Sequence, residues 1–360
     1  MKFGIEIAAN GLSIGQTSIN IAKCLHAKGL QPSIFPIANN IDFSCTEISE
    51  DFKQWYQSGV NKALKLHKRT DPLAKIWHIA GSFSSYSDFQ SLLFFHELDQ
   101  FSDYEINTLQ NQYKVLTPSK FSVDVLDSYG VKCEYCPLGV SDEFFRIEKR
   151  PYDDDRIVLG ISSKIELRKN HDKVLRAFAR KWGNNPKFIL HASLNNPFMQ
   201  PDQQNAMINQ ILEGQRIWNI NWIPPVQKNS EYNKVLNTFD IIIDMSGGES
   251  YSLPLAQCLK IGKTACVLKA HVFDTMYTDK EVVWVNPTGK RRMIDNIFFR
   301  ENDIFNNGNV FDVTEDAIID GIERTIERFK KEPINQAGIE LIKSYNWEKT
   351  TDILLENLKK

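Results

Sequence analysis

Residues 239–263, FDIIIDMSGGESYSLPLAQCLKIGK, hold the pattern that decides the fold. The run DIIID is nearly continuously apolar, which is typical of a strand buried on both faces of a parallel sheet. A glycine turn follows at 246–250, and then a helix with Pro254 in its first turn and Gly262 just past its end. This order directs backbone N–H groups and a helix N-terminus towards an anion. Glu249 would repel a phosphate, so we expect its carboxylate to accept hydrogen bonds from neutral hydroxyls, such as those of a sugar.

The composition is that of an ordinary globular protein, with 42% hydrophobic and 24% charged residues among 360. A chain of this length exceeds the size at which one hydrophobic core keeps growing, so two domains are expected. The net charge of −2 argues against a protein that binds nucleic acid over most of its surface. Glu6 and Asn10 interrupt the N-terminal apolar run, so it is read as a strand and not as a secretion signal. No apolar run reaches the length of a membrane span, and the scattered cysteines predict reduced thiols in the cytoplasm.

Alternating strand and helix patterns predict that residues 1–150 form one doubly wound α/β domain. The expected strands cover 3–8, 31–37, 74–80, 92–96 and 113–118. Ligands of such a sheet bind at the carboxyl ends of the strands. Gly15 follows the first strand, where a glycine would let a diphosphate approach the backbone, although a tight turn alone would also require one. His96 ends the fourth strand, where a catalytic group would belong, although a lone histidine is more often structural; His78 is expected inside the third strand.

Residues 151–345 repeat the alternation and are expected to form a second doubly wound domain after a polar linker. Its expected strands cover 157–162, 188–192, 217–223, 240–244, 264–268 and 282–285. Lys164, Arg168 and Lys169 lie between a strand and a helix, where they either hold a diphosphate or form a solvated face. Residues 290–309 are expected to form a long loop that begins with a basic triplet.

Several segments, in this order, resemble the family 4 glycosyltransferases of the GT-B fold, which are retaining enzymes that move a sugar from a nucleotide-sugar donor to an acceptor. The similar segments are VLTPSKFS at 115–122, CPLGVSDEFF at 136–145, ESYSLP at 249–254 and SYNWE at 344–348. Lys164 and Lys169 have the spacing of the Arg and Lys pair that holds the donor diphosphate in that family. The resemblance covers nearly the whole chain.

The resemblance implies two Rossmann-like doubly wound domains that face a cleft, with residues 346–360 forming a helix that crosses back onto the first domain. It implies a catalytic role for Lys169 at the diphosphate, for His96 near the reacting carbon and for Glu249 at the hydroxyls of the transferred sugar. The donor-binding residues that it implies are Gly15, Lys164, Arg168, Lys169, Gly247, Gly248, Glu249, Ser250, Tyr251, Ser252, Leu253 and Gln257.

Two residues depart from the pattern of that family. Gln257 stands where the family usually has a second glutamate, which contacts the donor ribose, and Lys164 stands where it has an arginine. An amide still forms a hydrogen bond with a hydroxyl, and a lysine still neutralises phosphate, although without a bidentate contact. The two departures leave open a changed donor preference or a degenerate, non-catalytic copy.

The expected function is therefore transfer of a hexosyl or pentosyl group from a nucleoside-diphosphate sugar to an acceptor hydroxyl, with retention and with neither a metal ion nor a cofactor. One alternative is the same reaction on a modified base in DNA, with Lys290, Arg291 and Arg292 touching the DNA backbone. Another is a non-catalytic protein that binds a nucleotide sugar or a glycan, and a phosphorylase or epimerase on the same fold is a third. The sequence specifies neither the sugar, the nucleotide, nor the acceptor, which would be a glycan, a lipid-linked compound or another hydroxyl; it also leaves the oligomeric state open.

Overall fold

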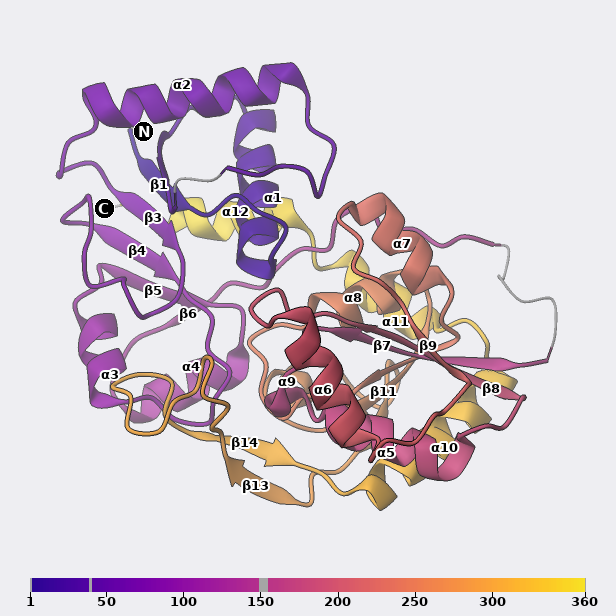
Figure 1. The fold of residues 1–360 in the computed structure, drawn as a ribbon. Helices are drawn as coiled ribbons and strands as arrows, with labels where there is room; N and C mark the ends of the chain where they lie inside the picture. Colours follow the sequence, from indigo (N-terminus) through magenta and orange to yellow (C-terminus); the bar gives the residue numbers. More distant parts are fainter. Residues whose placement is uncertain (1, 39–40, 149–154, 360) are drawn as a thin grey trace.

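A computed structural model describes residues 2–38, 41–148 and 155–359, and its first domain is built on a six-stranded parallel sheet (Figure 1). The strands are β1 (Gly4–Ile7), β2 (Ser33–Pro36), β3 (Leu73–Ile76), β4 (Gln90–Leu93), β5 (Lys114–Thr117) and β6 (Glu134–Tyr135), in the order β2-β1-β3-β4-β5-β6. The helices are α1 (Ser13–Ala27), α2 (Glu50–Leu66), α3 (Asp103–Gln110) and α4 (Lys120–Ser128). The chain reverses direction across the sheet between β1 and β3, which is where doubly wound sheets open a crevice.

The second domain repeats this plan with strand order β12-β11-β10-β7-β8-β9. Its strands are β7 (Ile157–Ser163), β8 (Phe188–Leu194), β9 (Ile220–Trp222), β10 (Ile241–Asp244), β11 (Thr264–Leu268) and β12 (Val283–Val285). Its helices are α5 (His171–Trp182), α6 (Pro201–Ile211), α7 (Asn229–Asn237), α8 (Leu253–Lys260), α9 (Val272–Met276), α10 (Glu315–Lys331) and α11 (Gln336–Lys343). Strand β10 lies between β7 and β11, so the apolar run predicted to be a doubly buried strand is confirmed as one.

The last helix, α12 (Trp347–Glu356), packs against α1 of the first domain, as the sequence predicted. Thr350 Oγ1 donates a hydrogen bond to the carbonyl of Pro137 (2.7 Å), and Ser91 Oγ donates one to the carbonyl of Asn357 (2.8 Å). Two facing Rossmann-like domains with a C-terminal helix returning to the first confirm the predicted fold class. The predicted boundary between residues 150 and 151 lies outside the described residues. None of the helices in the described part of the chain has the length and hydropathy needed to cross a bilayer.

Three sequence-based assignments were wrong or incomplete. Strand β3 ends at Ile76, so His78 lies in the following loop and not inside the strand. Helices α3 and α6 were missed because their sequences are polar and only a few of their side chains are buried. Residues 290–309 are not one long loop, because β13 (Gly289–Arg292) pairs antiparallel with β14 (Asn309–Asp312) and only the segment between them is irregular.

Candidate functional site

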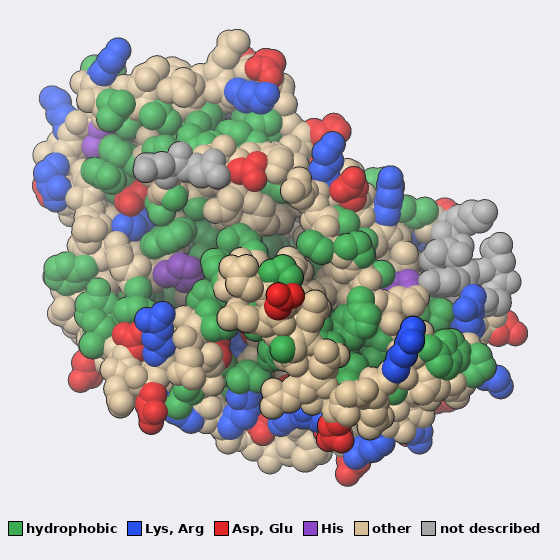
Figure 2. Space-filling model, viewed as in Figure 1, with side chains coloured by type: hydrophobic (Ala, Val, Ile, Leu, Met, Phe, Trp, Pro, Cys, Tyr) green, Lys and Arg blue, Asp and Glu red, His purple; other side chains and the backbone are tan. Residues whose placement is uncertain are grey.

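A cavity of about 810 Å³ lies between the two domains, where the strands of both sheets end. The first domain lines it with the loops after β1, β3 and β4, and the second with the loops after β7, β9 and β10, the start of α8 and residues 297–306. Figure 2 shows hydrophobic side chains gathered around the hollow between the domains. Its volume is in the range of small-molecule sites, about 300 to 1,000 Å³.

Glu249 lines this cavity within a cluster of cations and is only 5% exposed. Its Oε1 accepts hydrogen bonds from Lys169 Nζ and from Ser246 Oγ (3.1 Å), and Arg168 Nη1 lies 3.1 Å away. Burial alone would raise the pKa of Glu249, but Arg168 and Lys169 outweigh burial and hold this pKa at about 2. The carboxylate is therefore ionised and can only accept hydrogen bonds.

The loops that carry these charges are tied to each other by their backbones. A short 3-10 turn over 167–169 follows β7, and Asn170 ends it in the left-handed conformation with φ 52°. Asn170 Nδ2 donates to the carbonyl of Met245 (2.8 Å), and the amide of Gly247 donates to the carbonyl of Arg168 (2.8 Å). Since β7 and β10 are neighbouring parallel strands, their following loops meet at one edge, and this brings together cations and a carboxylate 80 residues apart.

Lys164, which stands at the family's arginine position, lines the same cavity. Its Nζ lies 2.7 Å from Glu166 Oε1, and 5.4 and 4.8 Å from the ring centroids of Phe198 and Phe298. Glu166 Oε2 also lies 2.9 Å from Arg168 Nε. Burial would raise the pKa of Glu166, but Arg168 and Lys164 lower it, so Glu166 is a second buried carboxylate that offsets part of the cationic charge.

The two glycines before Glu249 are needed for close packing, and neither is among the residues that line the cavity. A Cβ on Gly247 would lie 1.9 Å from the carbonyl oxygen of Phe311, and one on Gly248 would lie 1.9 Å from that of Glu97. Gly248 therefore marks a point where a loop of the first domain touches the loop after β10. Contact of these two glycines with a donor remains a prediction.

Gly15 lies inside the first turn of α1 and lines the cavity. A Cβ there would lie 2.3 to 2.7 Å from three atoms of Asn10, so any side chain would force apart the turn between β1 and α1. The structure supports the tight-turn interpretation of Gly15 and places the N-terminus of α1 at the cavity.

The start of α8 contributes several polar atoms without partners. Five residues of this region line the cavity, namely Ser250, Tyr251, Ser252, Leu253 and Gln257, and their contact with a donor remains a prediction. Ser252 Oγ donates to an oxygen of the β10 carboxylate Asp244 (2.7 Å). Within the described chain, Ser250 Oγ, Tyr251 OH and Gln257 Oε1 are buried and have no hydrogen-bond partner. Buried polar groups are nearly always satisfied in folded proteins, so these three indicate a place for a polar ligand.

His96 also reaches the cavity, but it is 2% exposed. Its ring stacks on Phe101, with centroids 3.9 Å apart, and its Nε2 lies 3.9 Å from Glu105 Oε1. Burial lowers the pKa of His96 in spite of the nearby carboxylates of Glu105 and Glu97, so the imidazole is neutral at pH 7. Neither ring nitrogen has a hydrogen-bond partner within the described chain. The ring can therefore donate or accept one hydrogen bond towards a ligand.

Sequence reasoning missed several contributors to the cavity, among them His78, Glu105 and the segment 297–306. His78 was assigned to a strand because the apolar run continues through Ile79, which is buried in a loop. Its position two residues after β3 is the signal that would have found it, since parallel sheets bind ligands beyond their carboxyl ends.

The basic triplet of β13 is bonded to the protein itself. Lys290 Nζ lies 2.9 Å from Asp99 Oδ2, Arg291 Nη2 donates to the carbonyl of Leu167 (2.5 Å), and Arg292 Nη2 donates to Asn307 Oδ1 (2.8 Å). Arg291 and Lys290 thereby join the hairpin to the loop after β7 and to the first domain. Their contacts supply no argument for a nucleic-acid surface.

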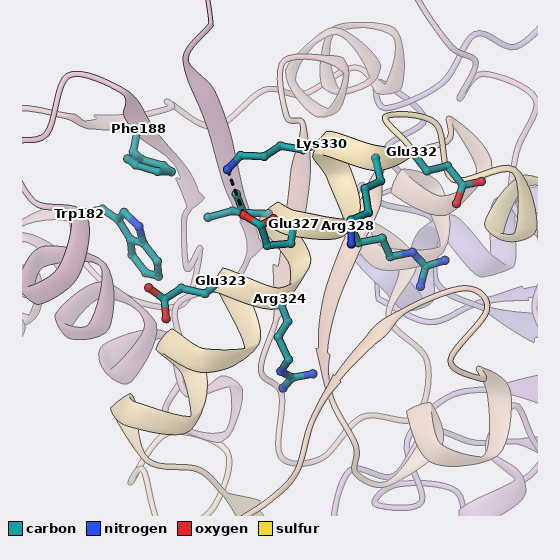
Figure 3. Close-up of a pocket in the computed structure, with 10 residues that line it drawn as sticks. Trp182, Phe188, Glu323, Arg324, Glu327, Arg328, Lys330 and Glu332 are labelled. Carbon is teal, nitrogen blue, oxygen red and sulfur yellow. Dashed lines mark hydrogen bonds and ion pairs between the residues drawn. The ribbon is translucent and has the colours of Figure 1, made fainter.

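A second hollow lies on the outer face of α10, away from this cavity (Figure 3). Trp182 and Phe188 form one side, and charged residues of α10 form the other. Arg324 donates to the carbonyl of Trp284 (2.9 Å), and Arg328 donates to that of Asp279 (2.8 Å). Because these guanidinium groups hold α10 against the domain, the hollow is a feature of helix packing. Nowhere in the described residues do three or more His, Cys, Asp or Glu side chains form a group that could hold a metal ion.

Comparison with solved structures identifies this arrangement as the GT-B fold of glycosyltransferases. HepE from Anabaena, solved in complex with UDP, aligns with a TM-score of 0.67 and 12% identity over 99% of both chains. Sucrose-phosphate synthase from Thermosynechococcus elongatus aligns with a TM-score of 0.66 and 12% identity over 99% of this chain and 98% of that one. A glycosyltransferase from Rickettsia africae aligns with a TM-score of 0.66 and 13% identity over 100% of this chain and 99% of that one. No known protein-family profile matches the sequence, and no curated protein sequence matches it significantly. At these identities the likeness establishes the fold.

Proposed function

We propose that this protein is a retaining glycosyltransferase of the family 4 type, which transfers a sugar from a nucleoside-diphosphate sugar to an acceptor hydroxyl in the cytoplasm. Structures of HepE from Anabaena with UDP and with UDP-glucose make uridine nucleotides the first donors to test. The observation that carries the proposal is the ionised Glu249 held between Arg168 and Lys169 in a cavity between two domains.

In the proposed reaction, the bond between the sugar's anomeric carbon and the diphosphate oxygen breaks, and a new bond forms from that carbon to the acceptor oxygen. The proton of the acceptor hydroxyl leaves with the diphosphate. Negative charge grows on the leaving group in the transition state, so cations fixed beside it lower the barrier. Arg168 and Lys169, together with the backbone amides at the starts of α8 and α1, would supply that stabilisation. A metal ion is not required in this scheme, because these groups carry the compensating charge.

Glu249 would hold the sugar. An ionised carboxylate has no proton to donate, so hydroxyl groups of the donor sugar are its natural partners once the ligand replaces one of its present contacts. Gln257 Oε1, buried and without a partner, would accept from a ribose hydroxyl. Neutral His96 would contact the sugar near the reacting carbon.

The proposal is tested by incubating the protein with UDP-, GDP- and ADP-sugars and measuring released nucleoside diphosphate, with EDTA in parallel. We expect one nucleotide series to be turned over, unaffected by EDTA, and the product to keep the donor's anomeric configuration by NMR. Binding without release would support the alternative of a non-catalytic nucleotide-sugar protein. Loss of nucleoside diphosphate release in EDTA would refute metal independence. A product with inverted anomeric configuration would refute retention.

A further inference from the structure

The two walls of the cavity differ in charge. Within the described part of the chain, the wall from the second domain carries five cations, namely Lys164, Arg168, Lys169, Lys228 and Arg300, and three carboxylates, namely Glu166, Glu249 and Asp303. Among the described residues that line the wall from the first domain there is neither a lysine nor an arginine, and its ionisable side chains are His78, His96, Glu97 and Glu105. An anion placed against the first-domain wall would meet carboxylates, and the cation that reaches this wall, Arg168, is already shared by Glu97, Glu166 and Glu249.

That same wall is rich in apolar surface. Leu12, Ile14, Trp77 and Phe95 all line it, and Leu12 is 40% exposed although it is a large hydrophobic residue. The opposite rim adds Phe198, which is 51% exposed. Exposed apolar groups that gather around a hollow, as in Figure 2, mark a binding surface more often than a solvated one.

The N-terminus of α1 is the exception on this wall, because its free amide groups favour an anion. Under the proposed function that position belongs to the donor diphosphate, which also contacts the cations opposite. The remainder of the first-domain wall, from Leu12 across Trp77 and Phe95, is then the surface left for the acceptor.

We propose that the acceptor is an uncharged glycoside whose sugar ring lays its apolar face on Leu12, Trp77 and Phe95, and that phosphorylated acceptors, including DNA, are rejected. This inference rests on the proposed function and names the acceptor class of the same site. The C–H groups of a sugar ring pack on aromatic and aliphatic surface, while its hydroxyls remain free for polar groups such as His78. Rejection follows because a phosphate would be desolvated beside Glu97 and Glu105, where the only wall-to-wall cation contact, that of Arg168 with Glu97 (3.7 Å) among the described residues, is already committed to carboxylates.

The inference is tested with matched pairs of acceptors, each a neutral methyl glycoside and the 6-phosphate of the same sugar, from glucose, galactose, mannose and N-acetylglucosamine. With the preferred donor, we expect at least one neutral member to accept sugar and its phosphate to have a roughly 100-fold lower kcat/KM. Equal or better use of a phosphorylated member, or transfer to DNA, would overturn the inference. Donor hydrolysis without transfer to any neutral member would also overturn it and would leave the proposed function standing. No hydrolysis and no nucleotide binding would instead count against the proposed function.

The second test adds a positive charge to the first-domain wall and measures the preference between neutral and phosphorylated acceptors. Leu12→Lys places a cation on the first-domain wall, and we expect it to shift the preference for the neutral member over its phosphate by roughly tenfold towards the phosphate. Leu64→Lys, at an 80% exposed position on α2, is the matched control and should leave the ratio unchanged. Trp77→Ala should raise the acceptor KM relative to the donor KM, whereas Trp218→Ala, 57% exposed on another surface, should not. An unchanged ratio in Leu12→Lys, with the variant folded by circular dichroism, would place the acceptor elsewhere.

Discussion

Replacing Glu249 by glutamine removes the carboxylate that contacts both Arg168 and Lys169 while it keeps the shape of the side chain. The usual pKa of a glutamate, 4.5, and the pKa of about 2 that Glu249 has in the fold differ by an amount equivalent to roughly 3 kcal/mol. Because this pKa is depressed, the stabilisation is fully present above the unfolded-state value and disappears as the pH falls towards the folded-state value. At pH 3 about half of it should remain.

Urea unfolding of the native protein and of Glu249→Gln at pH 7 and pH 3 measures this difference. We expect the variant to be less stable by roughly 3 kcal/mol at pH 7 and by about half as much at pH 3. Glu327→Gln is the control, because Glu327 contacts Lys330 at 3.1 Å on the exposed face of α10, and such pairs contribute about 1 kcal/mol or less. A difference that is small at pH 7, or equal at the two pH values, would show that Arg168 and Lys169 do not hold Glu249 ionised.

Three further predictions concern the same cleft. Lys169→Ala should lower release of nucleoside diphosphate roughly 100-fold, since one lost electrostatic donor costs about that much, while Lys187→Ala on the exposed surface should not; equal rates would remove Lys169 from the mechanism. Gln257→Glu should tighten donor binding by up to about tenfold in titration calorimetry, because a charged acceptor strengthens a hydrogen bond to ribose, and unchanged affinity would separate this residue from the ribose. Asp99→Asn should speed hydrogen exchange in β13 and β14, because it weakens the contact with Lys290 at 2.9 Å; native exchange rates would contradict that role.

The strand framework was predictable because a doubly wound fold buries its strands on both faces. Every residue of β1 and of β11 is buried; β11 appears in the sequence as a short, mainly apolar run, and β1 appears as one interrupted by Glu6. Gly262 ends α8 with φ 79°, a conformation that glycine adopts without strain, and this end was predicted from the residue alone. The hairpin of β13 and β14 gave no such signal, because its basic first strand is mostly exposed.

The candidate site could be predicted in its residues but not in its contacts. The strand, turn and helix around Glu249 indicated a ligand-facing carboxylate, and the turn after β7 indicated cations. Nothing in the sequence shows that Lys169 and Glu249 bond to each other, because that contact depends on β7 and β10 being neighbours. The contact of Gly248 with the carbonyl of Glu97 was equally hidden, since it joins two domains that the sequence cannot place relative to each other.

Two groups of polar contacts are among those that join the two domains. In one, the Asp99 carboxylate accepts a hydrogen bond from the backbone amide of Asn309 (2.8 Å) and also contacts Lys290 Nζ. In the other, Asn229 donates from its amide to the carbonyl of Cys45 (2.8 Å) and from its side chain to Glu143 (3.0 Å).

These contacts also place a limit on how the cleft can open. Buried apolar side chains of the two domains also pack together, since Leu98 forms one cluster with Met293, Phe299 and Val310, so domain separation would expose apolar surface as well as break polar contacts. Residues 297–306 are also bonded to the first domain, because Ser102 Oγ donates to the carbonyl of Ile304 (2.6 Å) and the Asn306 amide donates to Glu105 (3.1 Å). Under the proposed function, closure of the two domains over a bound donor would exclude water from the diphosphate.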